Sequence, residues 1–372
     1  DSTRPRLASI DRNRGPGAAD AVARAMGRRA RVRIGGLPRN RQVPNMDPAD
    51  MQQLQQRVQQ RLNGGLNENY GRELLELHTL GVDGGYTQQD VINVARALTG
   101  WTIRPPAAGG GFVFRPEMHD AGEKVVLGHK LAANRGIQDG EDVLDIVSRH
   151  PATARYIATK IARRFISDNP PKAVIDDAAA VFLKTDGDIR EVVRSIITSN
   201  EFYSQQAFRS KVKSPFEVVV SAMRAMNAEP DSTPRTAQAI AYLGEPIYGH
   251  QAPNGYPETG DAWMNTGAIL NRINFGMAAA ANRFPGASVR SIPGLDTLRS
   301  AARDKQVDAI VSVLLGGSVS PDTRAVLMSG DNPLMGNPND STSMSDTRGA
   351  RQLTGIAQVV GLALGSPEFQ RR

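Results

Sequence analysis

Residues 67–87 read NENYGRELLELHTLGVDGGYT, and this stretch decides how the chain is expected to fold. On a helix with about 100° per residue its apolar side chains share one stripe, which predicts a helix over 66–80 that Gly81 ends. Thr87 and Asp90 then have the spacing of a capping box and predict that a second helix begins. The stripe consists of Leu66, Tyr70, Leu74 and Leu77.

Similar start and stop signals recur along most of the chain, and the Ser-Pro-Phe-Glu sequence at 214–217 is the strongest of them. Only 101–131 differs, because Phe112–Phe114 and Val125–Leu127 are β-type runs that predict one small hairpin with a polar tip. We therefore predict a mainly α fold, a multi-helical globular body with one small hairpin. The other predicted helices are 51–62, 87–99, 141–149, 151–166, 171–184, 188–198, 214–227, 261–282, 305–315, 322–328 and 351–364.

The composition supports this fold class and excludes several functions. Hydrophobic residues make up 40% of the 372 residues, but only 2 Trp, 7 Tyr and 10 Phe occur, so the core must be aliphatic, which favours helices. The absence of cysteine excludes disulfides, a thiolate-bound metal and a Cys nucleophile. No apolar run is long enough for a membrane span. The sequence has no Walker A loop, Gly-x-Ser-x-Gly elbow or His-Glu-x-x-His motif.

The positive charge is concentrated at the N-terminus. Residues 1–62 contain 13 Arg, no Lys and 5 Asp, so they carry +8 while the rest of the chain carries −1 of the net +7. We expect 1–62 to be a basic, irregular, partly disordered segment with one Gln-rich helix. We expect 63–372 to be a single helical body with a mobile loop at 329–350. Since no aromatic residues interleave with the arginines, nucleic-acid binding is the weakest interpretation of this charge.

Further sequence pieces follow 67–87 in a fixed order, and together they resemble the family called domain of unknown function 1800 (DUF1800). The resemblance covers about 66–372. The pieces are Ala95–Trp101, His119-Asp120, Leu127-Gly128, His150–Ala154, Lys213–Glu217, Gly255–Pro257, Asp261–Trp263 and Gly365–Phe369.

The resemblance implies a bacterial, commonly exported protein, often encoded beside a sulfatase- or phosphatase-like partner, and it implies no reaction. We therefore expect a periplasmic or extracellular protein, although the chain starts at Asp1 and contains no signal peptide. The resemblance also implies that members usually have a longer helical region before 67–87, so we expect a site that this region completes to be missing or altered here.

The first predicted helix supplies one candidate site. On the helical projection Asn69, Glu73 and Glu76 share the flank beside the apolar stripe, whereas His78 points away from them. Two carboxylates one turn apart are suited to general acid–base catalysis or to binding a divalent cation. The structural alternative is that an arginine pairs with these carboxylates and fixes the helix in the core. The candidate partners are Arg72 and Arg96.

The polar tip of the predicted hairpin supplies a second candidate site. His119 beside Asp120 is suited to an oriented base or a metal ligand, and Lys124 lies nearby. The alternative is that one of the two caps a turn, because adjacent side chains usually point apart. The candidate catalytic residues are thus Glu73, Glu76, His78, His119 and Asp120, and the candidate ligand contacts include Asn69, Arg96 and Lys124.

A third candidate lies before the helix predicted at 261–282. Aromatic rings with neighbouring polar groups are suited to sugar binding by stacking and hydrogen bonds, but they also form ordinary buried polar corners. The candidate ligand contacts here are Tyr256, Asp261, Trp263 and Asn265.

Each candidate site has a structural explanation of its own. We therefore expect a non-catalytic helical binding or scaffold module that acts with a co-exported partner or a cell-surface polymer. The alternative is a hydrolase- or lyase-type enzyme on an extracellular polymer, in which a cleft joins the first predicted helix to the hairpin tip. The sequence identifies no cofactor, although a divalent cation is compatible with the clustered carboxylates.

Overall fold

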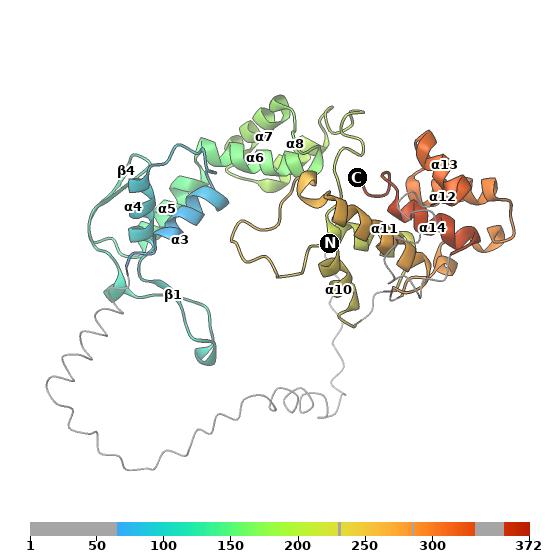
Figure 1. Cartoon of the computed structure of the whole chain (residues 1–372). Helices are drawn as coiled ribbons and strands as arrows, with labels where there is room; N and C mark the ends of the chain where they lie inside the picture. Colours follow the sequence, from blue (N-terminus) through green and yellow to red (C-terminus); the bar gives the residue numbers. More distant parts are fainter. Residues whose placement is uncertain (1–64, 230–231, 285, 332–352) are drawn as a thin grey trace, which may run out of the picture. The chain divides into compact units, whose positions relative to one another are not determined.

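The computed structural model describes residues 65–229, 232–284, 286–331 and 353–372 (Figure 1). In this part of the chain helices dominate and the only sheets are two short antiparallel pairs, so the predicted mainly α class is confirmed. The predicted basic segment 1–62 with its Gln-rich helix, and most of the predicted loop 329–350, lie outside the described residues.

Residues 67–87 form the helical segment that the sequence predicts, but its second half is wider than an α-helix. Helix α3 (Glu68–Glu73) continues into a π-helical turn over Leu74–His78. Helix α4 (Gln88–Ala97) begins at the predicted capping box, in which the Asp90 amide donates to Thr87 Oγ1 at 3.2 Å and the Thr87 amide donates to Asp90 Oδ2 at 2.8 Å. The helix starts are therefore set by local sequence.

The stretch 101–131 contains two hairpins, so the prediction of one hairpin there is wrong. Strand β1 (Trp101–Ile103) pairs with β2 (Phe112–Phe114), and β3 (Lys124–Val126) pairs with β4 (His129–Leu131). The reason lies in the two residues between β3 and β4, Leu127 and Gly128, which have φ values of 50° and 82°. Two positive φ values define the tight turn that best matches the twist of a hairpin, so β3 pairs with its nearest neighbour.

Four helices follow, and α6, α7 and α8 pack on one another (Figure 1). Their shared core is built largely from alanine and branched aliphatic residues, as the low aromatic content indicates. His150 caps α6, as its structural interpretation predicts, because its Nδ1 accepts from the Ala152 amide at 3.1 Å. The four helices are α5 (Gln138–Ser148), α6 (Pro151–Phe165), α7 (Lys172–Lys184) and α8 (Ile189–Ile197).

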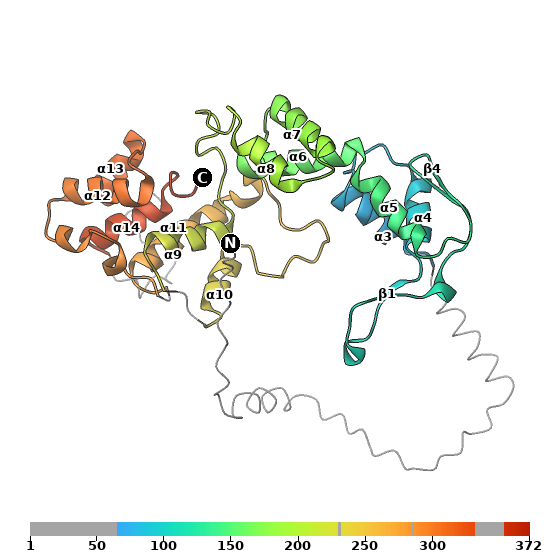
Figure 2. The ribbon, with the colours of Figure 1, turned by 180° about the vertical axis from the view of Figure 1, so that it is seen from behind.

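The last part of the chain, as far as the structure covers it, contains six α-helices, three of which line a cavity described below. Helix α11 begins at Thr266, later than predicted, because Gly260–Trp263 form a 3₁₀ turn and Asn265 caps the helix. Helices α11 and α14 pack against each other (Figure 2). The helices are α9 (Pro215–Ala225), α10 (Arg235–Tyr242), α11 (Thr266–Ala280), α12 (Arg303–Leu315), α13 (Pro321–Ser329) and α14 (Gly355–Gly365).

The C-terminal residues are tied to the segment that precedes α9. The Lys213 amide donates to the Gln370 carbonyl oxygen at 2.9 Å, and the Arg372 amide donates to the Lys211 carbonyl oxygen at 2.9 Å. Val212 and Arg371 form an antiparallel bridge between them. The chain end is therefore part of the fold. Among the helices described, none combines the length and apolar character needed to cross a membrane.

Small residues allow α11 and α14 to approach closely, and this contact can be tested at Gly276. A Cβ atom there would lie 2.9 Å from the Gly361 carbonyl oxygen, so we expect Gly276→Ala to lower the free energy of unfolding by about 1–3 kcal/mol. Gly267, exposed in the same helix, has only the Asn265 side-chain oxygen nearby, at 3.5 Å, and is the control. Gly267→Ala should be neutral or stabilising by up to about 1 kcal/mol in urea unfolding. Equal effects of the two substitutions would contradict this packing.

Candidate functional site

A buried group of charged side chains, the polar centre (His119, Lys124 and Asp139), joins the β hairpins to α5. Lys124 and Asp139 side chains are 0% and 1% exposed, and Lys124 Nζ donates to Asp139 Oδ2 at 2.7 Å. The same ammonium donates to the carbonyl oxygens of Asp120 at 2.5 Å and Gly122 at 2.8 Å. All three hydrogens of the ammonium therefore have acceptors inside the protein.

His119, a candidate catalytic residue, belongs to this centre and is also buried. Its Nε2 lies 3.3 Å from Asp139 Oδ2, and its Nδ1 lies 2.9 Å from the Thr99 carbonyl oxygen. The ring also contacts Phe114 edge to face. Both ring nitrogens have protein partners and the side chain is 3% exposed, which is the environment of a structural histidine.

Asp120 lies beside the polar centre and forms a two-pronged ion pair with Arg96. Arg96 Nε donates to Oδ2 at 2.9 Å and Nη2 donates to Oδ1 at 3.1 Å. The Arg96 hydrogen bond, reinforced by the Gly122 amide, lowers the pKa of the Asp120 carboxyl to about 2. Arg96 also donates to Asn93 Oδ1 at 3.0 Å. The hypothesis that Arg96 pairs with a glutamate of the first helix is therefore wrong, because Asp120 holds this guanidinium.

The carboxylates of the first helix line a separate small hollow of about 210 Å³. Arg72, the other predicted partner, donates to Gln88 Oε1 at 2.6 Å instead of pairing with a glutamate. Glu76 accepts from Tyr86 at 3.4 Å, and burial followed by the Glu76 charge raises the pKa of Tyr86. The exposed His78 is outside this hollow. The hollow brings together Asn69, Arg72, Glu73, Glu76, Leu77 and Pro253.

The carboxylates of the first helix and the polar centre belong to two separate sites. The small hollow contains neither His119 nor Asp120. No hydrogen bond or ion pair between described residues joins Glu73 or Glu76 to those two side chains. A cleft that joins them therefore stays a prediction.

The aromatic candidates before α11 use their polar atoms within the protein. Tyr256 donates to the Pro246 carbonyl oxygen at 2.7 Å, and Trp263 Nε1 donates to the Pro257 carbonyl oxygen at 3.1 Å. Asn265 accepts from the Ala268 amide at 2.9 Å as the cap of α11. Asp261 is exposed. These contacts match the structural alternative, a polar corner, for the first three residues.

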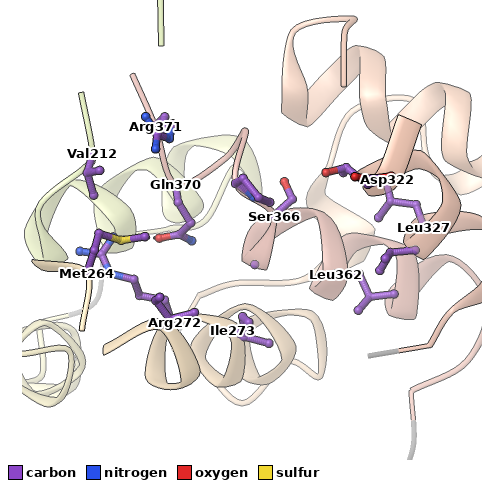
Figure 3. Close-up of a pocket in the computed structure, with 15 residues that line it drawn as sticks. Val212, Met264, Arg272, Ile273, Asp322, Leu327, Leu362, Ser366, Gln370 and Arg371 are labelled. Carbon is purple, nitrogen blue, oxygen red and sulfur yellow. Dashed lines mark hydrogen bonds between the residues drawn. The ribbon is translucent and has the colours of Figure 1, made fainter. Parts of the chain in front are cut away.

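A second hollow, larger than the one beside the first helix, was not predicted from the sequence. It has a volume of about 520 Å³ and lies among α11, α13, α14 and the C-terminal residues (Figure 3). Most of its wall is apolar. Its lining residues are Val212, Met264, Ile269, Arg272, Ile273, Asp322, Thr323, Val326, Leu327, Leu362, Gly365, Ser366, Pro367, Gln370 and Arg371.

Arg272 is the buried charged residue in the wall of this cavity and is 1% exposed. Its Nη1 donates to Gln370 Oε1 and its Nη2 to the Lys213 carbonyl oxygen, both at 2.9 Å. Its Nε is buried and has no hydrogen-bond partner among the described residues. Burial lowers the pKa of Arg272, but an arginine stays protonated at neutral pH.

Asp139 and Arg272 were not predicted as site residues, because neither stands in a motif. Asp139 precedes the helix start predicted at 141, whereas α5 begins at Gln138 and includes it. Acidic residues are common in the first turn of any helix, so Asp139 gave no sign of its partners. Arg272 stands within the predicted helix 261–282 without a motif around it. Both residues are recognised as parts of a site only by their contacts with residues that are distant in the sequence.

The fold and these sites define a mainly helical protein with a buried ion-paired centre and a separate, largely apolar cavity. Among the described residues, no group of three or more His, Asp or Glu side chains is arranged to hold a metal ion. The family model described as protein of unknown function (DUF1800) matches residues 37–371, so the chain belongs to the DUF1800 family. The match begins earlier than the predicted 66. No curated protein and no solved structure matches the chain.

The Lys124–Asp139 pair should be essential for stability. Lys124→Met leaves the Asp139 carboxylate buried without its ammonium partner, and we expect the free energy of unfolding to fall by about 3–5 kcal/mol. The control is Lys130→Met in β4, whose ion pair with Glu123 is exposed, and it should change stability by less than about 1 kcal/mol. The double variant Lys124→Met/Asp139→Leu should recover part of the loss. Equal urea midpoints for Lys124→Met and Lys130→Met would contradict the assignment.

The Asp120–Arg96 pair should make stability depend on pH in the acidic range. The folded-state pKa of about 2 lies below the ordinary value of 3.8, so the pair stabilises the protein above pH 3.8 and this stabilisation is lost as the pH falls towards 2. Because the carboxylate is partly exposed, we expect Asp120→Asn to cost only about 1–2 kcal/mol at neutral pH. In thermal unfolding the difference from the unsubstituted protein should shrink below about pH 4. A difference that stays constant down to pH 3 would contradict the pair's role.

Proposed function

We propose that this protein is a non-catalytic helical binding module that holds a small, largely apolar ligand in the cavity beside α11, α13 and α14. One observation carries the proposal: the cavity of about 520 Å³ is lined mainly by apolar side chains and contains one buried guanidinium. Ligand sites in proteins have this size and this mixture of apolar wall and few polar groups.

The cavity has room for an elongated ligand. A methylene group is close in size to a water molecule, which occupies about 30 Å³ in the liquid. A chain of ten carbons therefore needs about 300 Å³, which is less than the volume of about 520 Å³. Ile273 and Leu362 supply part of the apolar surface along which such a chain would lie (Figure 3).

The candidate catalytic groups support binding more than catalysis. His119 is buried with both ring nitrogens engaged, and Asp120 is bound by Arg96. A general acid or base must reach the substrate, and these two side chains face protein partners instead. The enzyme alternative therefore depends on Glu73 and Glu76 in the small hollow, whose lining adds only Pro253 from outside 69–77.

The proposal also includes where the protein acts, and this part is inferred from the family resemblance alone. Export to the periplasm or the cell exterior, and action with a co-exported partner or a cell-surface polymer, are properties that the DUF1800 resemblance implies. A cavity of about 520 Å³ has room for a small molecule or one acyl chain rather than for an extended polymer. Binding such a ligand is a function that requires no catalytic residues.

The proposal predicts that filling the cavity prevents binding of an apolar probe. Decanol is the probe, and titration calorimetry measures its affinity for the full chain. Ile269→Trp places a larger side chain in the cavity wall, and we expect it to weaken decanol binding by about tenfold or more. The control is Leu270→Trp, the next residue of α11, which is exposed and outside the lining. Failure of the unsubstituted protein to bind decanol, or equal loss in both variants, would overturn the proposal.

A further inference from the structure

Three long cationic side chains of the described structure are almost completely buried, and their partners differ. Lys124 donates to Asp139 at 2.7 Å, and Lys211 donates to Asp168 Oδ1 at 2.6 Å. Arg272 has no carboxylate within ion-pair distance among the described residues, and its two hydrogen-bond acceptors are a side-chain amide and a backbone carbonyl. Since burying a charge is costly unless an opposite charge compensates it, Arg272 is the exception that needs an explanation.

Two carboxylates, Glu217 and Glu245, attract Arg272 without contacting it, and both form hydrogen bonds with other groups. Glu217 accepts from Arg164 at 2.7 Å and from Arg372 at 3.1 Å. Glu245 accepts from the Phe216 amide at 2.8 Å. Neither contacts Arg272, although both act on it electrostatically. The guanidinium thus has no contacting carboxylate, and the low dielectric constant of its buried position strengthens its attraction for an anion.

A half-buried cation, Lys213, lies next to Arg272. The Lys213 carbonyl oxygen accepts from Arg272, and Lys213 Nζ lies 4.1 Å from the centre of the Phe369 ring. Burial lowers the pKa of Lys213 to about 8, so this ammonium is still mainly protonated at neutral pH. Lys213 is not part of the cavity lining, in which Arg272 and Arg371 are the cationic residues and Asp322 is the anionic one.

The charged residues that line the cavity give it a direction. In Figure 3 Arg272 lies near Met264 and Gln370, whereas Asp322 lies at the other side with Leu327. The apolar side chains of Ile273 and Leu362 lie between them. An anionic head is favoured at Arg272 and disfavoured at Asp322, so an apolar tail would extend from the former towards the latter.

We infer that the cavity binds a single-chain carboxylate amphiphile, with its head on Arg272 and its alkyl chain on the apolar wall. This inference rests on the proposed binding function and names the class of ligand. An arginine has five N–H donors, and the contacts of Arg272 with described residues use two of them. A carboxylate oxygen at this wall accepts from the guanidinium and supplies the missing negative charge.

A panel of ten-carbon ligands tests the head group on the unsubstituted full chain. Decanoate, decanol and decyltrimethylammonium share the same tail and differ in charge, and titration calorimetry at about pH 7 compares their affinities. We expect decanoate to bind about tenfold or more tightly than decanol, and the cation to bind most weakly. Decanoate and decanol of equal affinity would overturn the inference but leave the proposed function intact. No binding of any of the three would overturn both.

A variant then assigns the effect to Arg272. In Arg272→Met the advantage of decanoate over decanol should shrink to within about twofold. The control is Arg324→Met in α13, which removes an exposed arginine paired with Asp308 and should preserve the advantage. Because Arg272 also holds Lys213 and Gln370, circular dichroism must show that the variant is folded. If it is unfolded, the panel on the unsubstituted protein decides. An undiminished advantage in folded Arg272→Met would overturn the assignment.

Discussion

The buried guanidinium of Arg272 is the interaction on which the C-terminal part of the structure depends. The Arg272 side chain extends from α11. It donates to the Lys213 carbonyl oxygen before α9 and to Gln370 near the C-terminus. Gln370 in turn donates to the Leu364 carbonyl oxygen at the end of α14. One side chain therefore links segments that are far apart in sequence. It also forms part of the cavity wall, so the same residue connects stability and the proposed binding function.

The other buried charges show how the protein normally compensates a cation. Lys124 has Asp139, and Lys211 has Asp168, which also accepts from the Gly260 amide at 2.8 Å. Both lysines therefore contact a carboxylate within the protein, although Asp139 Oδ1 is buried without a hydrogen-bond partner among the described residues. Arg272 has polar neighbours but no contacting carboxylate, and it borders a cavity. This contrast within one molecule separates residues that hold the fold from a residue that is also suited to receive an anion.

Local sequence predicted the helices well and their partners poorly. Thr87 with Asp90, His150 and the motif at 214–217 begin helices where predicted, because capping depends on residues within one turn. The β-type runs did not reveal their pairing, which the turn at Leu127 decided.

The candidate sites follow the same division. The projection of the first helix correctly grouped Asn69, Glu73 and Glu76, since all three lie on consecutive turns. The ion pairs of Arg96 with Asp120 and of Lys124 with Asp139 join different elements, and no spacing rule predicts them. The cavity is even harder to predict from the sequence, because the residues of its wall are scattered between positions 212 and 371 and share no motif. Most of the helical architecture is therefore local information, whereas the proposed binding site exists only in the folded chain.

A crystal structure of the full chain with decanoate that carries a terminal bromine tests the central claim most directly. Bromine scatters anomalously, so its position and the carboxylate are located independently. The account predicts the carboxylate within hydrogen-bond distance of Arg272 and the bromine among the apolar residues towards Leu327. A carboxylate at the Asp322 side, or a ligand bound outside this cavity, would contradict it.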